Sequence, residues 1–246
     1  MINQTDFDKA FQSGYTFQYN LPYNEGLCDV TFSIHNMGEL VVTSGTLVAA
    51  DPLLPPDPFH SFPQSIQPGR YPVIASVAHL RQLELQEYQS EFSADDWRIA
   101  CMMLRISQKT AVTWQSTDDF GYGVDSATGS LMDMDAALVL YDLYRAELYD
   151  EYRNRLYAKF DEFDYSPLND DCHEYRNRLY AKFHHLFDPL VKWASIQVSD
   201  TTEANVMAFT SGYGDGHYPS YWGYDEESNL ACLVTDFILF RKENDD

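Results

Sequence analysis

Four aspartates in glycine-rich or apolar surroundings are the residues of this chain best suited to chemistry. Asp125 lies in GYGVDSATGSLMD, Asp215 and Asp225 lie in SGYGDGHYPSYWGYDEES, and Asp236 interrupts the apolar run from Leu230 to Phe240. A carboxylate in a buried strand must be paired, hydrogen-bonded or metal-bound, because burying it bare is strongly unfavourable. If the fold gathers all four, they would form an oxygen-ligand cluster suited to Mg²⁺, Mn²⁺ or Ca²⁺.

Other side chains near Asp215 could complete a catalytic site. Ser211 and His217, with Asp215 itself, are the candidates for polarising a substrate. Three aromatic side chains follow that could stack on a substrate ring: Tyr218, Tyr221 and Trp222. The structural alternative is that such aspartates bind their own turns and that the histidine only packs on the surface. No HExxH, GxxxxGK[ST], GxSxG or EF-hand signature is present, so the reaction type stays open.

The elements that position these loops are mainly strands. Val206, Ala208 and Thr210 alternate with their neighbours before the second loop, and Leu230–Phe240 follows it as an apolar strand. The segment ELVVTSGTLVAADP predicts two strands joined in a hairpin by a Ser44–Gly45 turn. Four glycines of the second loop permit a tight backbone: Gly212, Gly214, Gly216 and Gly223.

After the first loop the apolar period changes to that of a helix. Asp133 stands where an N-cap belongs and Asp135 places a negative charge in the first turn, so a helix is predicted from about Met134. Residues at i+4 spacing predict one stripe that packs in the core: Leu140, Tyr144, Leu148, Tyr152, Leu156 and Phe160.

The sequence EYRNRLYAKF occurs twice, at 151–160 and 23 residues later at 174–183. Identity over ten positions indicates a recent tandem duplication, because packing alone would tolerate drift. The two copies hold six of the 16 basic residues, which are expected to pair with acids on the main body or to mark a contact surface. We interpret 151–187 as a duplicated helical insert.

Together these patterns predict a single α+β domain over residues 1–246. Its sheets are mainly antiparallel, arranged as a sandwich or as one strongly curved sheet, with the helical segment 134–187 packed to one side. Residues 1–40 are expected to form an N-terminal arm and the first strand.

Charge limits the class of partner. The 38 acidic residues against 16 basic ones give a net charge of −22, which repels nucleic acid and anionic membranes and attracts basic proteins and cations. The alternative is that acidity only keeps a tyrosine-rich chain in solution. The polar start and the absence of a spanning apolar run predict a cytoplasmic protein. Cys101 and Cys232, each in an apolar run, are expected in the core.

The chain resembles an uncharacterised, largely bacterial family, the domain of unknown function numbered forty-two forty-one. The resemblance begins near Val41 and is carried by TSGTLVAADPL, GRYPV, GVDSATGSLMD, WASIQVS, and above all ANVMAFTSGYGDGHYPSYWGYD followed by LVTDF. In the family the first loop usually looks like VDAGTG, and here Ser126 and Ala127 replace Ala and Gly. The tandem EYRNRLYAKF is a further departure. The resemblance implies no settled activity or cofactor.

Two functional hypotheses follow. The first is an acidic binding protein, of immunity or antitoxin type, that engages a basic protein partner by charge complementarity. The second is a divalent-metal-dependent hydrolase built on the aspartate cluster, with Mg²⁺, Mn²⁺ or Ca²⁺ as its metal.

Overall fold

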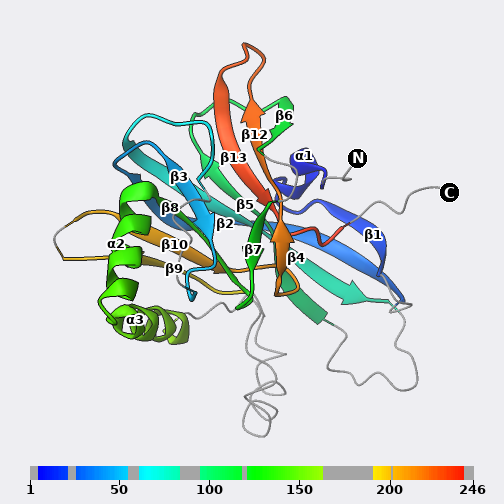
Figure 1. Ribbon diagram of the computed structural model, residues 1–246. Helices are drawn as coiled ribbons and strands as arrows, with labels where there is room; N and C mark the ends of the chain where they lie inside the picture. Colours follow the sequence, from blue (N-terminus) through cyan, green and yellow to red (C-terminus); the bar gives the residue numbers. More distant parts are fainter. Residues whose placement is uncertain are drawn as a thin grey trace, which may run out of the picture.

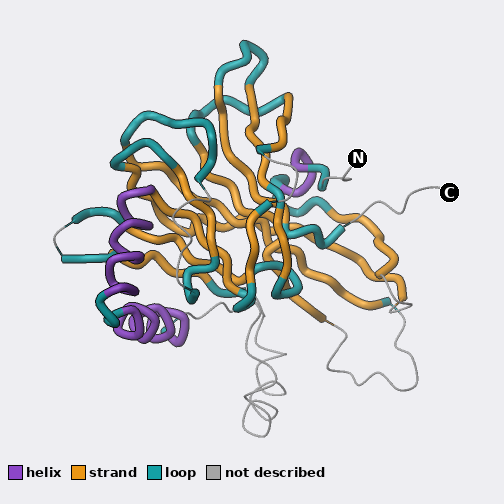
Figure 2. Tube along the Cα trace, in the orientation of Figure 1, coloured by secondary structure: helices purple, strands orange, loops and turns teal. Residues whose placement is uncertain are grey.

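The computed structural model describes residues 5–21, 26–54, 61–83, 95–117, 121–162, 191–200 and 202–240. Seven antiparallel strands form the larger sheet, in the order β1-β2-β4-β5-β13-β12-β6 (Figure 1). The bounds of these strands are Thr16–Leu21 (β1), Gly26–Val42 (β2), Gly69–Gln82 (β4), Asp95–Arg105 (β5), Thr113–Ser116 (β6), Ser220–Tyr224 (β12) and Leu230–Asp236 (β13). The long strands β2 and β4 give this sheet its curl (Figure 2).

A second antiparallel sheet packs against the first. Its order is β3-β8-β10-β9, and its strands are Leu47–Ala50 (β3), Thr128–Asp133 (β8), Trp193–Gln197 (β9) and Asn205–Thr210 (β10). Alternation along β10 sorts its side chains: Met207 and Phe209 enter the core shared with the larger sheet, while Val206 and Ala208 face the helices. The predicted α+β class with mainly antiparallel sheets is therefore confirmed.

Helices cover the outer faces of the two sheets. The second sheet is covered by α2, Met134–Arg145, and α3, Tyr149–Asp161, which lie at an angle to each other (Figure 1). The short helix α1, Phe7–Ala10, packs with Phe240 on the outer face of the larger sheet. None of the helices in the described ranges is long and apolar enough to cross a membrane.

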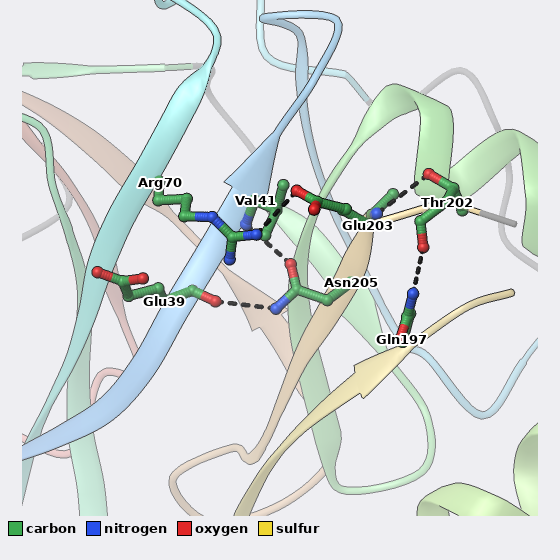
Figure 3. Close-up of polar contacts among 8 residues, drawn as sticks. Glu39, Val41, Arg70, Gln197, Thr202, Glu203 and Asn205 are labelled. Atoms are coloured by element: carbon green, nitrogen blue, oxygen red, sulfur yellow. Dashed lines mark hydrogen bonds and ion pairs between the residues drawn. The ribbon is translucent and has the colours of Figure 1, made fainter. Parts of the chain in front are cut away.

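A buried amide joins the two sheets. The side-chain oxygen of Asn205 on β10 accepts the Val41 N–H at 2.8 Å, and its Nδ2 donates to the Glu39 carbonyl at 2.8 Å (Figure 3). The Glu39 carbonyl and the Val41 N–H lie on the edge of β2 that faces away from β4. The Asn205 amide therefore supplies the hydrogen-bond partners that these two backbone groups need. At the surface beside it, Arg70 forms an ion pair with Glu203 at 2.8 Å.

The N-terminal segment contains the expected strand, whereas the hairpin predicted around Ser44–Gly45 does not form. Residues 5–40 contain α1, the edge strand β1 and most of β2. The two strands around Ser44–Gly45 exist, but they do not pair: β2 bonds to β4, while β3 bonds to β8 in the other sheet. The hairpin prediction was therefore wrong, because the turn passes the chain from one sheet to the next.

The predicted helix also divides. A break at 146–148, where Glu147 takes a positive φ of 58°, separates α2 from α3. The core stripe is consequently interrupted: Leu140, Tyr152, Leu156 and Phe160 are buried, whereas Tyr144 and Leu148 are 49% and 44% exposed. The part of the predicted insert from residue 163 to 187, which includes the second copy of the repeat, lies outside the described residues.

Candidate functional site

The two glycine-rich loops meet in space. A small sheet joins β7, Tyr122–Val124, to β11, Gly216–Tyr218, with His217 opposite Gly123. Beyond this pair the Ser211 N–H donates to the Ala127 carbonyl at 3.1 Å. Segments separated by about 90 residues of sequence thus form one surface feature, which we call the loop pair and define as residues 121–128 and 211–218.

Asp215 holds the loop pair together. Its carboxylate accepts the Ala127 N–H at 2.9 Å, and Ala127 has a positive φ of 53°. This conformation is unfavourable for alanine, so the bond from Asp215 stabilises a strained position that glycine would adopt more readily. Asp215 itself is exposed.

The hydroxyl groups near Asp215 are used inside the loop. Ser211, 1% exposed, donates its Oγ–H to the Gly214 carbonyl at 2.8 Å. Tyr218 donates its phenolic O–H to the same carbonyl at 2.7 Å, and burial raises its pKa. His217 is exposed on β11. Both hydroxyl groups thus stabilise the turn at Gly214, and the Ser211 hydroxyl is directed into the loop and not toward the solvent.

Asp125 lies on the exposed side of the loop pair, above a buried carboxylate. Its backbone N–H donates to Asp51 at 2.9 Å, and the Ser126 hydroxyl donates to the same carboxylate at 2.7 Å. Asp51 is only 6% exposed and also accepts the Leu53 N–H. The sequence does not single out this aspartate, because its partners in the loop pair, Asp125 and Ser126, are 74 and 75 positions away.

Asp225 closes the turn between β12 and β13. It accepts the backbone N–H groups of Glu227 and Asn229 at 2.9 and 2.8 Å, together with the Asn229 side-chain amide. The hydrogen bonds from Asn229 and Glu227 lower its pKa below the usual value.

Asp236 ties the N-terminal segment to the end of β13. Its carboxylate accepts the Thr5 N–H and the Thr5 hydroxyl, both at 2.8 Å, and the Ile238 N–H at 2.8 Å. It is 1% exposed. Since Asp225 precedes β13 and Asp236 ends it, the length of the strand, roughly 20 Å, separates these two carboxylates.

The four aspartates therefore do not share one recess. Asp125 and Asp215 lie on the loop pair, while Asp225 and Asp236 lie at opposite ends of a hairpin arm. Across the described ranges, no three His, Cys, Asp or Glu side chains are grouped so that they could hold a metal ion. The gathering on which the metal hypothesis depends is not found.

The three aromatic candidates lie in the core. Tyr221 and Trp222 are neighbours on β12 and point to opposite faces of the sheet, where they contact Phe7 and Phe62 at ring distances of 5.4 and 5.9 Å. Tyr218 packs against Phe237 at 5.0 Å. All three are less than a tenth exposed, so they do not offer a ring face to a solvent-borne ligand.

The cysteines in the described ranges are core residues. Cys28, Cys101 and Cys232 are buried and unbridged. Burial raises the pKa of Cys28 to about 11 and that of Cys232 to about 12, which keeps both thiols protonated and unreactive near neutral pH. The expected core positions of Cys101 and Cys232 are confirmed.

Sequence reasoning missed a second feature, the surface of α2. Leu138, Tyr141 and Tyr144 follow one another at i+3 on this helix; Leu138 and Tyr144 are 46% and 49% exposed and Tyr141 is partly so. Leu148 continues the row into the turn before α3, where it is 44% exposed.

Acids stand beside this apolar row. Asp142 lies one turn after Leu138, and Glu147 lies in the turn; both are exposed. Arg145 and Ala146 are exposed in the same stretch. We give the name α2 surface to the exposed apolar residues and the acids beside them: Leu138, Asp142, Tyr144, Glu147 and Leu148. The surface depends on the helix break at Glu147, which takes Tyr144 and Leu148 out of the buried stripe and which the i+4 pattern of the sequence does not mark.

The family comparison agrees with the resemblance in the sequence. The model of a family described as "Protein of unknown function (DUF4241)" matches residues 40–235. This range includes the second sheet, the loop pair, α2 and α3, and most strands of the larger sheet, but not β1 or most of β2. No curated protein and no solved structure matches the chain. Since the match covers most of the chain, this protein belongs to the DUF4241 family.

Proposed function

We propose that the protein is an acidic binding module that engages a basic protein partner through the α2 surface. The observation that carries the proposal is the exposure of Leu138, Tyr144 and Leu148, each more than two-fifths accessible, on one helix and its turn. Large apolar side chains gathered on a surface are typical of sites where another protein docks.

Charge determines the kind of partner. Asp142 and Glu147 flank the apolar row, and the whole chain carries a net charge of −22. A partner with Lys and Arg around an apolar patch would bury the leucines and the tyrosine, while the negative field would accelerate its approach. A nucleic acid or an anionic lipid would be repelled by the same field.

This mode of binding is that of an immunity or antitoxin protein, which occupies a basic toxin or nuclease by complementary charge. We place the interaction in the cytoplasm, a reducing compartment in which Cys28, Cys101 and Cys232 would remain the free thiols that they are here.

Selection from a random peptide library displayed on phage tests the proposal. Peptides selected on the native chain at low salt should be enriched in Lys and Arg next to aromatic or aliphatic residues, and raised salt should release them. Counter-selection uses the variant Asp142→Lys/Glu147→Lys. The matched control Asp8→Lys/Glu226→Lys makes the same charge change at exposed acids of other elements. Enrichment of neutral or acidic peptides, or equal recovery on both variants, would overturn the proposal.

The metal-dependent hydrolase is distinguished by a separate measurement. Melting midpoints are recorded with and without Mg²⁺, Mn²⁺ or Ca²⁺ for the native chain and for Asp215→Asn. Since Asp215 binds the Ala127 N–H and not a ligand cluster, the midpoints should move in parallel. A rise in the native chain that Asp215→Asn lacks would favour the hydrolase.

A further inference from the structure

The first copy of the repeat shows what the sequence EYRNRLYAKF does in the fold. In α3, Tyr152, Leu156 and Phe160 are buried at i+4 spacing, with exposed fractions of 0%, 0% and 7%. They pack on an apolar face of the second sheet and α2 that we call the α3 docking face, formed by Leu140, Ala194, Ile196, Val198 and Val206.

Polar contacts fix the helix on this face. The Arg155 guanidinium donates to the carbonyls of Gln197 and Val198 at 3.5 and 3.4 Å. Every group that makes these contacts recurs 23 residues later, as Tyr175, Arg178, Leu179 and Phe183. The α3 docking face therefore has no chemical means of distinguishing the ten residues of one copy from those of the other.

We infer that the α3 docking face is a binding site for the sequence EYRNRLYAKF and that residues 174–183 of the same chain can replace residues 151–160 on it. The inference is independent of the proposed partner. The exchange requires that the chain be long enough to connect residues 174–183, placed on the α3 docking face, to α2 on one side and to β9 on the other.

The connection to β9 is the shorter one. Arg155 reaches the end of β9, Phe160 lies about 7.5 Å further along the helix, and Trp193 lies about 13 Å back along the strand. The ten residues from Phe183 to Trp193 can span roughly 33 Å. The sum of the distance along the helix, the distance along β9 and the length of one arginine side chain is smaller than this, so the connection is long enough. The connection from Arg145 becomes longer on exchange and sets no limit.

The flanking residues explain which copy occupies the face in this structure. Tyr149, just before the first copy, is 6% exposed and donates its phenolic O–H to the carbonyls of Pro52 and Leu54 at 3.0 and 2.5 Å. The equivalent position before the second copy is Cys172, which has neither the length nor the hydroxyl. Tyr149 thus favours the first copy, and damage to that copy should transfer the preference to the second.

A set of buried-charge variants tests the exchange by thermal melting. Leu156→Asp makes the first copy unfit for the α3 docking face, and Leu179→Asp does the same to the second. Leu179→Asp alone should leave the midpoint unchanged, Leu156→Asp should lower it modestly, and the double variant should lower it much further than the two single shifts together. Leu140→Asp, at an equally buried position with no duplicate, should be as severe as the double variant.

Two controls keep the result specific. Asn154 is exposed in α3, so Asn177→Asp at the equivalent position should add nothing to Leu156→Asp. The midpoint of Leu156→Asp should also be the same at two protein concentrations tenfold apart, since the replacement comes from the same chain. The inference is overturned if Leu156→Asp is as severe as Leu140→Asp, if Leu179→Asp adds nothing to it, or if rescue depends on concentration.

Discussion

Asp236 accepts three hydrogen bonds at 1% exposure and connects the N-terminal segment to the last strand. Removing its side chain would leave the Thr5 and Ile238 amides buried without their acceptor, so Asp236→Ala should lower the free energy of unfolding by about 2–4 kcal/mol. Urea denaturation measures this loss. Thr5→Val, which removes only the hydroxyl contact, should be milder, by about 1 kcal/mol. Equal losses would show that the backbone contacts contribute nothing.

Asp225 provides a prediction on pH. Its pKa in the folded chain is below the ordinary 3.8, because Asn229 and Glu227 donate to the carboxylate. The stabilisation is therefore present above pH 3.8 and is lost as the pH falls through the lower folded value. The difference in unfolding free energy between the native chain and Asp225→Asn should be largest near neutral pH and should become smaller in acid. A difference that is constant across this range would contradict the assignment.

Among the elements, the start of α2 was predictable and its surroundings were not. Asp133 caps the helix by accepting the Asp135 N–H at 3.0 Å, as the sequence pattern predicts. The same carboxylate also accepts the Ser44 and Gly45 N–H groups from a turn almost 90 residues away. The N-cap bond joins Asp133 to a residue two positions away, so a local sequence pattern predicts it. The bonds to the Ser44–Gly45 turn depend on how the two sheets pack, and a local pattern does not predict this packing.

The candidate site divides in the same way. Strand alternation and glycine content located the loops, and the structure brings the loops of Asp125 and Asp215 together. The partners of the buried acids were not predictable: Asp236 bonds to a residue 231 positions away, and a carboxylate that ties down a backbone resembles in sequence one that binds a metal. Exposure of Tyr144 and Leu148 likewise depends on the break at Glu147.

One copy of EYRNRLYAKF should be enough for the fold. Deleting 161–183 and deleting 151–173 produce the same chain, which carries one copy of EYRNRLYAKF with the residues 184–192 leading to β9. Because that connection is long enough, the shortened chain should melt cooperatively and keep its α3 docking face covered. Circular dichroism and hydrogen exchange of β9 and β10 measure this. Loss of the cooperative transition would show that the longer segment is required for folding.

At the scale of the whole molecule, the fold is a sandwich of two antiparallel sheets, with helices on one outer face and the N-terminal segment on the other (Figure 1). The buried acids Asp51, Asp133 and Asp236 connect segments that are distant in sequence, while Asp225 closes its own turn. The exposed acids contribute to the negative field. The carboxylates of Asp51, Asp133, Asp225 and Asp236 thus act within the fold, which leaves recognition to the exposed surface.

Recognition through the α2 surface is measured by the affinity of a selected basic peptide for three forms of the chain. Titration calorimetry at low and moderate salt compares the native chain with Asp142→Lys/Glu147→Lys and Asp8→Lys/Glu226→Lys. Kd should rise with salt, and the α2 surface variant should bind at least about tenfold more weakly, while the Kd of the control should change by less than about threefold. Equal weakening in both variants, or a Kd indifferent to salt, would contradict recognition through the α2 surface.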